Sequence, residues 1–129
     1  MNQPPDNIAA HLFALNAARG AKTAYLDDRA TLSYADLEDR ARRLAATLAA
    51  LGIRREERVL LLMLDCNEWP VSFLGCLYAG VVPVAVNTLL TADDYAYMLA
   101  HSRARAVLVS GALVPMLVQA MAKMPAEVP

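Results

Sequence analysis

The chain has 129 residues, a formal net charge of −1 and an apolar fraction of 57%. This length suits one modest domain or part of a larger one, and the near-neutral charge excludes a strong field that would attract nucleic acid or an anionic membrane. No apolar run reaches the ~18–20 residues that a bilayer span requires. We therefore expect no nucleic-acid and no membrane partner.

Residues 1–6 are predicted to be a flexible, polar lead-in. A helix is predicted from Asn7 to Arg19, with Asp6 or Asn7 as its cap and Gly20 as its end. Its apolar residues recur at helical spacing, at Ile8, Leu12, Phe13 and Leu15. A small antiparallel hairpin follows, with strands at 23–26 and 30–32 around the polar turn 27–29.

Ser33 and Asp36 then form a variant of the capping box that opens a helix running to Leu51, and Gly52 is its stop. The predicted apolar stripe of this helix is Tyr34, Leu37, Ala41, Leu44, Ala45, Leu48 and Leu51. Two interpretations of Arg42 and Arg43 are possible. They either bind a phosphate or belong to a solvated face with pairs such as Asp36 to Arg40, and we favour the solvated face.

From residue 58 the order is strand, helix, strand, helix, strand, helix. The strands are predicted at 59–64, 82–86 and 106–109. The helices are predicted from the Asn67 cap, with Pro70 in the first turn, to Gly80, at 91–102 and at 111–123. The run Val59–Leu64 is apolar at every position, which is typical of a parallel strand buried on both faces. Short loops and right-handed crossovers then predict an α/β fold with a three-layer, mostly parallel sheet and flanking helices.

In this second part, particular residues indicate where the helices begin, end and pack closely. Gly80 ends one helix, and the capping box of Thr91 and Asp94 opens the next. Gly75 inside a helix costs up to ~1 kcal/mol against alanine, so we expect it to allow close packing of that helix on the sheet. The predicted stripe of the closing helix is Leu113, Leu117, Met121 and Met124.

Polar residues leave the carboxyl ends of the first two buried strands, where ligands bind in open α/β sheets. Asp65 and Asn67 follow one strand, and Asn87 and Thr88 follow the other. Asp65 and Asn67 either form a capped turn, with Asn67 as helix cap, or line a site, and we favour the capped turn. His11 and His101 are predicted to be surface residues, His101 suiting the end of its helix.

Motifs that carry chemistry are missing. The sequence has no phosphate-binding Gly-rich loop followed by lysine, no dinucleotide fingerprint, no paired metal ligands and no nucleophile elbow. The two cysteines, Cys66 and Cys76, lie in one hydrophobic stretch and suit reduced thiols in a cytoplasmic protein. We therefore assign no catalytic, cofactor-binding or metal-binding residue.

Three stretches, in this order, resemble the start of the adenylate-forming (AMP-binding) superfamily of acyl- and aryl-CoA ligases, adenylation domains and luciferases. Leu32-Ser33-Tyr34-Ala35-Asp36-Leu37 is similar to its first core motif, with Asp36 in place of the usual Glu. Leu77-Tyr78-Ala79-Gly80-Val81-Val82-Pro83-Val84 is similar to its second core motif, and residues 62–69 match the strand and turn between them. The stretch 86–99 looks most like the benzoate-CoA ligase branch. Some relatives have at the position of Leu89 an Arg that can contact a phosphate of CoA, and Leu89 cannot make this contact.

The resemblance implies an aryl-CoA ligase that activates an aromatic carboxylate with Mg-ATP, forms an acyl-adenylate, and transfers the acyl group to CoA. In the family the phosphate loop, acyl pocket, ribose-binding Asp and mobile lysine lie after the stretch matched here. The resemblance therefore implies ATP, Mg2+ and CoA as cofactors of the whole ligase, and none bound by this segment. Residues 7–124 would be an incomplete N-terminal segment of the AMP-binding domain, inactive alone, and 125–129 a truncated linker. The alternative is a stand-alone, non-catalytic α/β binding or interaction module.

Overall fold

The computed structural model describes residues 7–125. In chain order its elements are α1 (Ile8–Leu15), η1 (Ala17–Arg19), β1 (Thr23–Leu26), β2 (Thr31–Ser33), α2 (Tyr34–Ala50), β3 (Arg58–Leu62), α3 (Glu68–Tyr78), β4 (Val82–Ala85), α4 (Ala92–Ser102), β5 (Ala106–Val109), η2 (Gly111–Leu113) and α5 (Val114–Ala122). The expected lead-in 1–6, and all of the expected linker except Pro125, lie outside the described residues.

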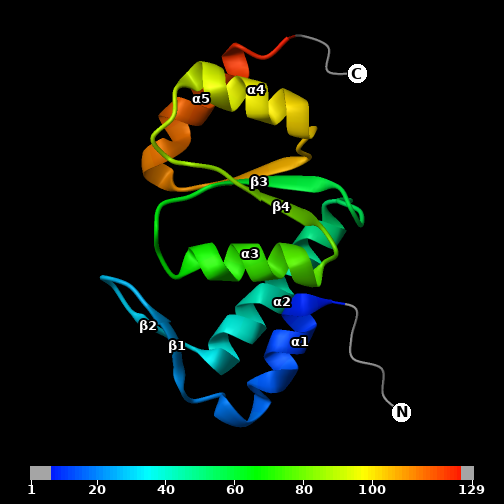
Figure 1. The fold of residues 1–129 in the computed structure, drawn as a ribbon, viewed down its shortest axis with the longest axis vertical. Coiled ribbons are helices and arrows are strands. Elements are labelled where there is room, and N and C mark those ends of the chain that lie inside the picture. Colours follow the sequence, from blue (N-terminus) through cyan, green and yellow to red (C-terminus); the bar gives the residue numbers. More distant parts are fainter. Residues whose placement is uncertain (1–6, 126–129) are drawn as a thin grey trace.

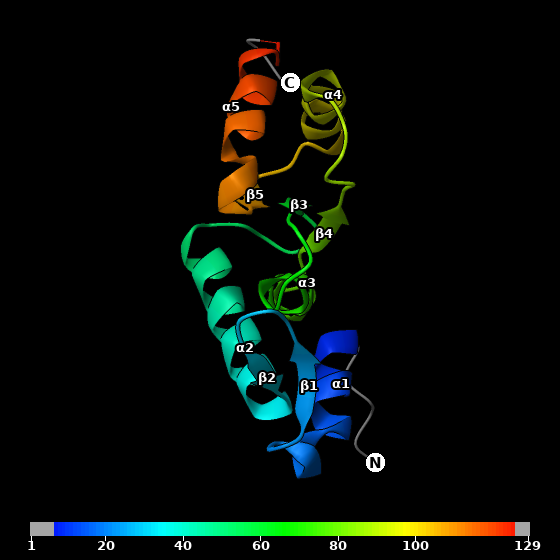
Figure 2. The same cartoon turned by 90° about the vertical axis from the view of Figure 1, so that its left-hand side faces the viewer.

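The main sheet has the strand order β4-β3-β5, and both pairings are parallel. Helices α2 and α3 lie on one face of this sheet and α4 and α5 on the other, so the molecule has three layers (Figures 1 and 2). The predicted three-layer α/β fold is confirmed. The predicted hairpin is also present, as the separate antiparallel pair of β1 and β2.

The central strand β3 shows why the layers form. Its residues Val59, Leu60, Leu61 and Leu62 are all 0% exposed. Because successive side chains of a strand point to opposite faces, Val59 and Leu61 join one core with Leu48, Cys76 and Val81. Leu60 and Leu62 join the other core with Tyr95, Leu99, Leu117 and Ala120. A strand that is apolar at every position therefore needs helices on both faces, as predicted.

A third core joins the N-terminal elements to α2 and α3. It contains Ala9 and Phe13 of α1, Leu32 of β2, Leu37 and Ala41 of α2, and Val71 and Leu74 of α3. Asn7 caps α1, since its Oδ1 accepts from the backbone N–H groups of Ala9 and Ala10. Its Nδ2 donates to the carbonyl of Leu77 at 2.6 Å, which ties α1 to the end of α3.

The first helix is shorter than predicted. It ends at Leu15, and Gly20 does not cap it but has an ordinary helical φ of −51°. The reason is Asn16, whose side chain donates to the carbonyl of Leu12 at 2.8 Å, a local bond of the kind that competes with helix continuation. Of the apolar residues at helical spacing, Phe13 is buried, whereas Ile8, Leu12 and Leu15 are exposed.

The caps of the later helices agree better with prediction. Gly52 and Gly80 have φ of +80° and +76°, the left-handed conformation expected where a helix stops. Thr91 and Asp94 form the complete reciprocal capping box. Ser33 accepts from the N–H of Asp36 at 3.1 Å, which is half of such a box. The closing helix begins later than predicted, because residues 111–113 form the 3-10 turn η2.

Gly75 was correctly predicted to mark a close approach, but the partner is a helix and not the sheet. A Cβ atom at this position would lie 2.8 Å from Cδ2 of Leu44 and 3.1 Å from the carbonyl oxygen of Ala41. Both neighbours belong to α2. The glycine therefore sets the contact between α2 and α3.

Three further details of the helices were predicted wrongly. Leu51 and Met121 are 69% and 57% exposed and belong to no buried stripe. Arg40 does not pair with Asp36 but reaches Glu68 of α3 at 3.3 Å, since Glu68 presents its carboxylate at the start of a helix that packs on α2. The solvated interpretation of the other arginines is confirmed: Arg42 pairs with Glu38 and Arg43 with Asp39.

Within residues 7–125, no helix combines the length and apolar character needed to cross a membrane.

Candidate functional site

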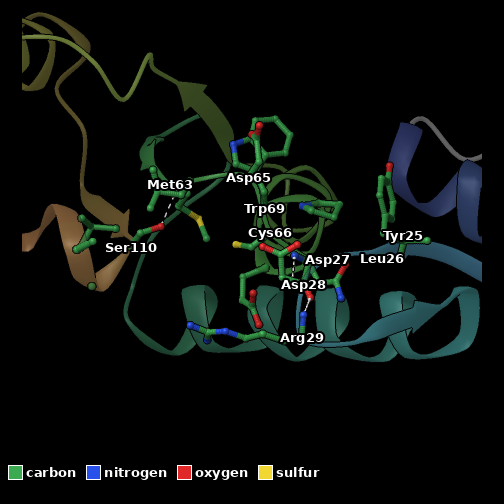
Figure 3. Close-up of a pocket in the computed structure, with 17 residues that line it drawn as sticks. Tyr25, Leu26, Asp27, Asp28, Arg29, Met63, Asp65, Cys66, Trp69 and Ser110 are labelled. Atoms are coloured by element: carbon green, nitrogen blue, oxygen red, sulfur yellow. Dashed lines mark hydrogen bonds between the residues drawn. The ribbon is translucent and has the colours of Figure 1, made fainter.

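A cleft of about 1030 Å³ opens at the carboxyl edge of the main sheet. Three segments line it: the hairpin tip 25–29, the β3–α3 connection with the first turn of α3 (63–70), and the β5–η2 connection (109–112). Figure 3 shows Ser110 on one side, Tyr25 on the other, and Asp65, Cys66 and Trp69 between them. Leu26 and Tyr25 on the hairpin side are 73% and 47% exposed.

The cleft lies where the sheet topology opens a crevice. Strands β3 and β5 are neighbours, but the helices that follow them, α3 and α5, pack on opposite faces of the sheet (Figure 1). The two connections therefore diverge as they leave the sheet. This is the arrangement in which open α/β sheets place their ligand sites.

Ser110 holds the two strand ends together at the floor of the cleft. Its Oγ accepts a hydrogen bond from the backbone N–H of Leu64 at 2.9 Å, and its own N–H donates to the carbonyl of Leu62 at 3.0 Å. These two hydrogen bonds fix the chain between residues 62 and 64, although it lies beyond the end of strand β3. Our sequence reasoning did not anticipate this role for a serine directly after a strand.

Asp27 connects the hairpin to the β3–α3 connection. One carboxylate oxygen accepts from the backbone N–H groups of Arg29 and Ala30, both at 2.9 Å, which closes the hairpin turn. The other accepts from the backbone N–H of Asn67 at 3.0 Å. The N–H of Asn67, followed by those of Arg29 and Ala30, lowers the pKa of Asp27, because each bond favours the ionised form. From the sequence, Asp27 was predicted only as part of the hairpin turn 27–29, and its contact with Asn67 was not predicted.

Asn67 lines the cleft, but the prediction that its side chain caps α3 is wrong. The residue has helical dihedral angles and its side chain makes no capping bond. Its Nδ2 donates instead to the carbonyl of Ala30 at 2.9 Å, because the hairpin tip lies within reach. Asn67 is 5% exposed, and its Oδ1 has no hydrogen-bond partner among residues 7–125. Asn67 and Asp27 together fasten the hairpin tip to the main sheet.

Cys66, the thiol that lines the cleft, is not activated. Burial, and after it a hydrogen bond with the Glu68 carboxylate, raises the pKa of Cys66. Because the thiolate is the nucleophilic form, this environment disfavours nucleophilic chemistry. Glu68 has a lowered pKa through its own backbone N–H and the Cys66 thiol, with a smaller effect of Arg40.

The remaining candidate residues do not gather at the cleft. Asp65 lies exposed on its wall. Asn87 and Thr88 leave β4 at the same sheet edge, as the parallel pairing requires, but on the other side of β3. The carbonyl of Asn87 accepts from the buried Tyr95 hydroxyl at 2.6 Å, a structural contact.

Both histidines are exposed, as predicted, and the ring of His101 stacks on that of Tyr97 at 5.3 Å. In the described part of the chain no three His, Cys, Asp or Glu side chains converge as metal ligands. The structure thus presents a three-layer parallel α/β scaffold with an open crevice between the ends of β3 and β5. Asp27, Asn67 and Ser110 hold the loops around this crevice together.

Comparison with known proteins identifies the family. The sequence profile described as "AMP-binding enzyme" matches residues 13–128, so the chain belongs to this family. It is 42% identical over 121 residues to a 4-hydroxybenzoate–CoA/benzoate–CoA ligase of Rhodopseudomonas palustris, covering 92% of this chain and 22% of the relative. It is 43% identical over 122 residues to a benzoate–CoA ligase of Thauera aromatica, covering 92% of this chain and 23% of the relative.

Solved structures of CoA ligases also resemble this chain. A benzoate CoA ligase from Burkholderia xenovorans LB400 superposes with a TM-score of 0.89 at 59% identity, over 91% of this chain and 24% of that one. An anthranilate CoA ligase in complex with anthranoyl-AMP superposes with a TM-score of 0.88 at 30% identity, over 96% of this chain and 24% of that one. The chain therefore resembles the N-terminal part of these ligases, and spans about a fifth to a quarter of their length.

Proposed function

We propose that this chain is the N-terminal scaffold of an ATP-dependent CoA ligase that activates an aromatic carboxylate of the benzoate class, and that residues 7–124 form part of its AMP-binding domain. The observation that carries the proposal is the 59% identity to a benzoate CoA ligase over 91% of the chain. Two curated relatives, at 42% and 43% identity, support the same substrate class. We place the ligase in the cytoplasm, since both cysteines are free thiols.

The residues that line the cleft do not fit the triphosphate of ATP, and among residues 7–125 no three His, Cys, Asp or Glu side chains converge to hold Mg2+. A triphosphate needs cations and backbone donors, whereas the cleft is lined by the four acids Asp27, Asp28, Asp65 and Glu68 and by one arginine, Arg29. The Asp27 carboxylate is already occupied by three backbone N–H groups. We therefore assign the binding of nucleotide and CoA, and all catalytic groups, to parts of the ligase other than this scaffold.

A segment exchange tests the proposal. The part of the Burkholderia xenovorans ligase that matches this chain is replaced by the chain itself, and formation of benzoyl-CoA from benzoate, ATP and CoA is measured. We expect activity, because the inserted chain is 59% identical to the segment it replaces and superposes on it with a TM-score of 0.89. The same ligase lacking the segment is the negative control. A folded chimera that forms no benzoyl-CoA contradicts the proposal.

A further inference from the structure

A second hollow lies at the amino edge of the main sheet, between the start of α1 and the entrance to β4. It is a groove of about 320 Å³, which is large enough for a single six-membered ring, since an apolar cavity of about 150 Å³ can hold benzene. Its apolar walls are formed by Ile8, Leu77, Val81, Val82 and Pro83. Ile8 and Val82 are 61% and 43% exposed, so these walls are open to solvent.

Arg55 is the polar group of this groove that is free to bind a ligand. The other polar side chain in the lining, Asn7, uses its Oδ1 to cap α1 and its Nδ2 to bond two carbonyls at the end of α3. Among residues 7–125, no carboxylate lies within ion-pair distance of Arg55, whereas the adjacent Arg54 reaches Glu57 at 3.6 Å. No acid is found among the described residues that line the groove. The groove therefore combines apolar walls with one uncompensated positive charge.

The backbone around Gly80 holds Arg55 against the groove. A Cβ atom at Gly80 would lie 3.3 Å from Cγ of Arg55, so the stem of the arginine rests where only a glycine leaves room. The N–H of Glu56 donates to the carbonyl of Gly80 at 2.8 Å. Glu56 has a φ of +67°, a left-handed conformation that is uncommon outside glycine. Such conformations persist only where the surroundings fix them, and they cluster at binding sites.

From these features we infer that the groove binds a small carboxylate with an apolar body, one ring in size. The carboxylate pairs with the Arg55 guanidinium, whose two parallel N–H groups match its two oxygens. The apolar body covers Ile8 and Val82. A phosphate chain fits less well, because it needs several cations and donors, and the groove offers one arginine. The large cleft at the opposite edge of the sheet is lined by four acids, which repel a carboxylate.

Two other occupants compete for the groove. The first is the segment 1–6, which ends with the carboxylate of Asp6 directly before Asn7. This segment is polar apart from Met1, Pro4 and Pro5, and so matches the apolar walls poorly. The second is the remaining polypeptide of a ligase. The inference itself goes beyond the proposed function, because it needs only the side chains of this chain.

A titration with sodium benzoate tests the inference, since benzoate has one ring and one carboxylate. The methyl resonances of Ile8 and Val82 are followed by NMR in the 129-residue chain and in the chimera with the Burkholderia xenovorans ligase. We expect saturable shifts in both samples, and an affinity for the uncharged benzamide lower by about 10-fold or more. Sodium chloride at equal ionic strength is the control. The absence of saturable shifts, or equal affinities for benzoate and benzamide, overturns the inference.

A matched pair of arginine variants tests the ion pair. Arg55→Gln is expected to weaken benzoate binding by about 10-fold or more, because it removes the charge that the carboxylate meets. Arg54→Gln removes the same charge from an adjacent residue that does not line the groove, and is expected to change the affinity little. Both side chains are exposed, so both variants should keep the thermal midpoint of the wild type. Equal losses of affinity in the two variants overturn the inference, because they indicate a general effect of charge.

The competing occupants give different results in the same titration. Shifts that appear only after Asp6→Asn assign Arg55 to the N-terminal segment and overturn the inference. Shifts in the isolated chain but not in the folded chimera show that the rest of the ligase covers the groove, and overturn it as well. Benzoyl-CoA formation by the same chimera sample separates the two proposals. An active chimera without shifts overturns the groove alone, and a folded, inactive chimera with shifts overturns the proposed function alone.

Discussion

At the scale of single residues, Asp27 joins the hairpin to the carboxyl edge of the sheet through three backbone N–H groups. Its folded-state pKa lies below the ordinary value of 3.8. The ionised carboxylate therefore stabilises the fold fully above pH 3.8, and this contribution is lost as the pH falls through the folded-state pKa. We expect Asp27→Asn to lower the urea midpoint at pH 7, and the difference from wild type to shrink below pH 3.8. Asp28→Asn at the adjacent exposed residue is the control, and a difference that is constant with pH counts against this role.

Gly75 tests the contact between α2 and α3. Alanine gains up to ~1 kcal/mol in helix propensity, but its Cβ would lie 3.1 Å from the backbone oxygen of Ala41, which cannot move as a side chain can. Overpacking of this kind costs about 1–3 kcal/mol. We expect Gly75→Ala to lower the free energy of unfolding by about 1 kcal/mol, measured by urea denaturation. Gly111→Ala, where no atom lies within 4 Å, is the matched control. A stabilised Gly75→Ala variant would show that the helices can separate at little cost.

Cys76 reports on the core between α2, α3 and the sheet. Burial raises the pKa of Cys76 to about 11. At pH 8 about one thiol in a thousand is then ionised, and the side chain is also 0% exposed. We expect a thiol reagent to label Cys66 slowly in the native chain and Cys76 only in denaturant, as read by peptide mass spectrometry. Labelling of Cys76 at the rate of Cys66 without denaturant contradicts the packing described.

At the scale of elements, the start of α4 is fixed by a capping box. The Thr91 hydroxyl accepts from the N–H of Asp94 at 3.2 Å, and the Asp94 carboxylate accepts from the N–H of Thr91 at 3.0 Å. Thr91→Ala removes the hydroxyl that accepts from the N–H of Asp94. We expect this change to lower the free energy of unfolding by about 1 kcal/mol. Thr91→Ser keeps the hydroxyl and should cost much less. Equal losses in the two variants would show that the methyl group, and not the cap, matters.

Element ends were predictable where the chemistry is local. Gly52, Gly80 and the box at Thr91 follow from backbone conformation and near neighbours in sequence, and the structure confirms them. Asn67 was predicted wrongly because its amide is taken by Ala30, a residue 37 positions away. Gly75 shows the intermediate case: the sequence indicated a close approach, and only the structure identifies α2 as the neighbour.

At the scale of the whole molecule, the layers were predictable and the cleft was not. A strand apolar at every position and the alternation of strands and helices suffice for a three-layer sheet. The place of the cleft depends on strand order, which puts β5 beside β3. It also depends on the hairpin, which arrives from residues 25–29 to form one wall. Both are long-range features, and Asp65 and Asn67 alone could not indicate them.

The central claim is that this chain is the scaffold of an aryl-CoA ligase and that the catalytic groups lie elsewhere in that ligase. Pyrophosphate release by the isolated chain, with benzoate, Mg-ATP and CoA, tests it most directly, and the active chimera serves as positive control. We predict release no faster than in a blank without protein. Steady, benzoate-dependent turnover by the 129-residue chain would contradict the claim.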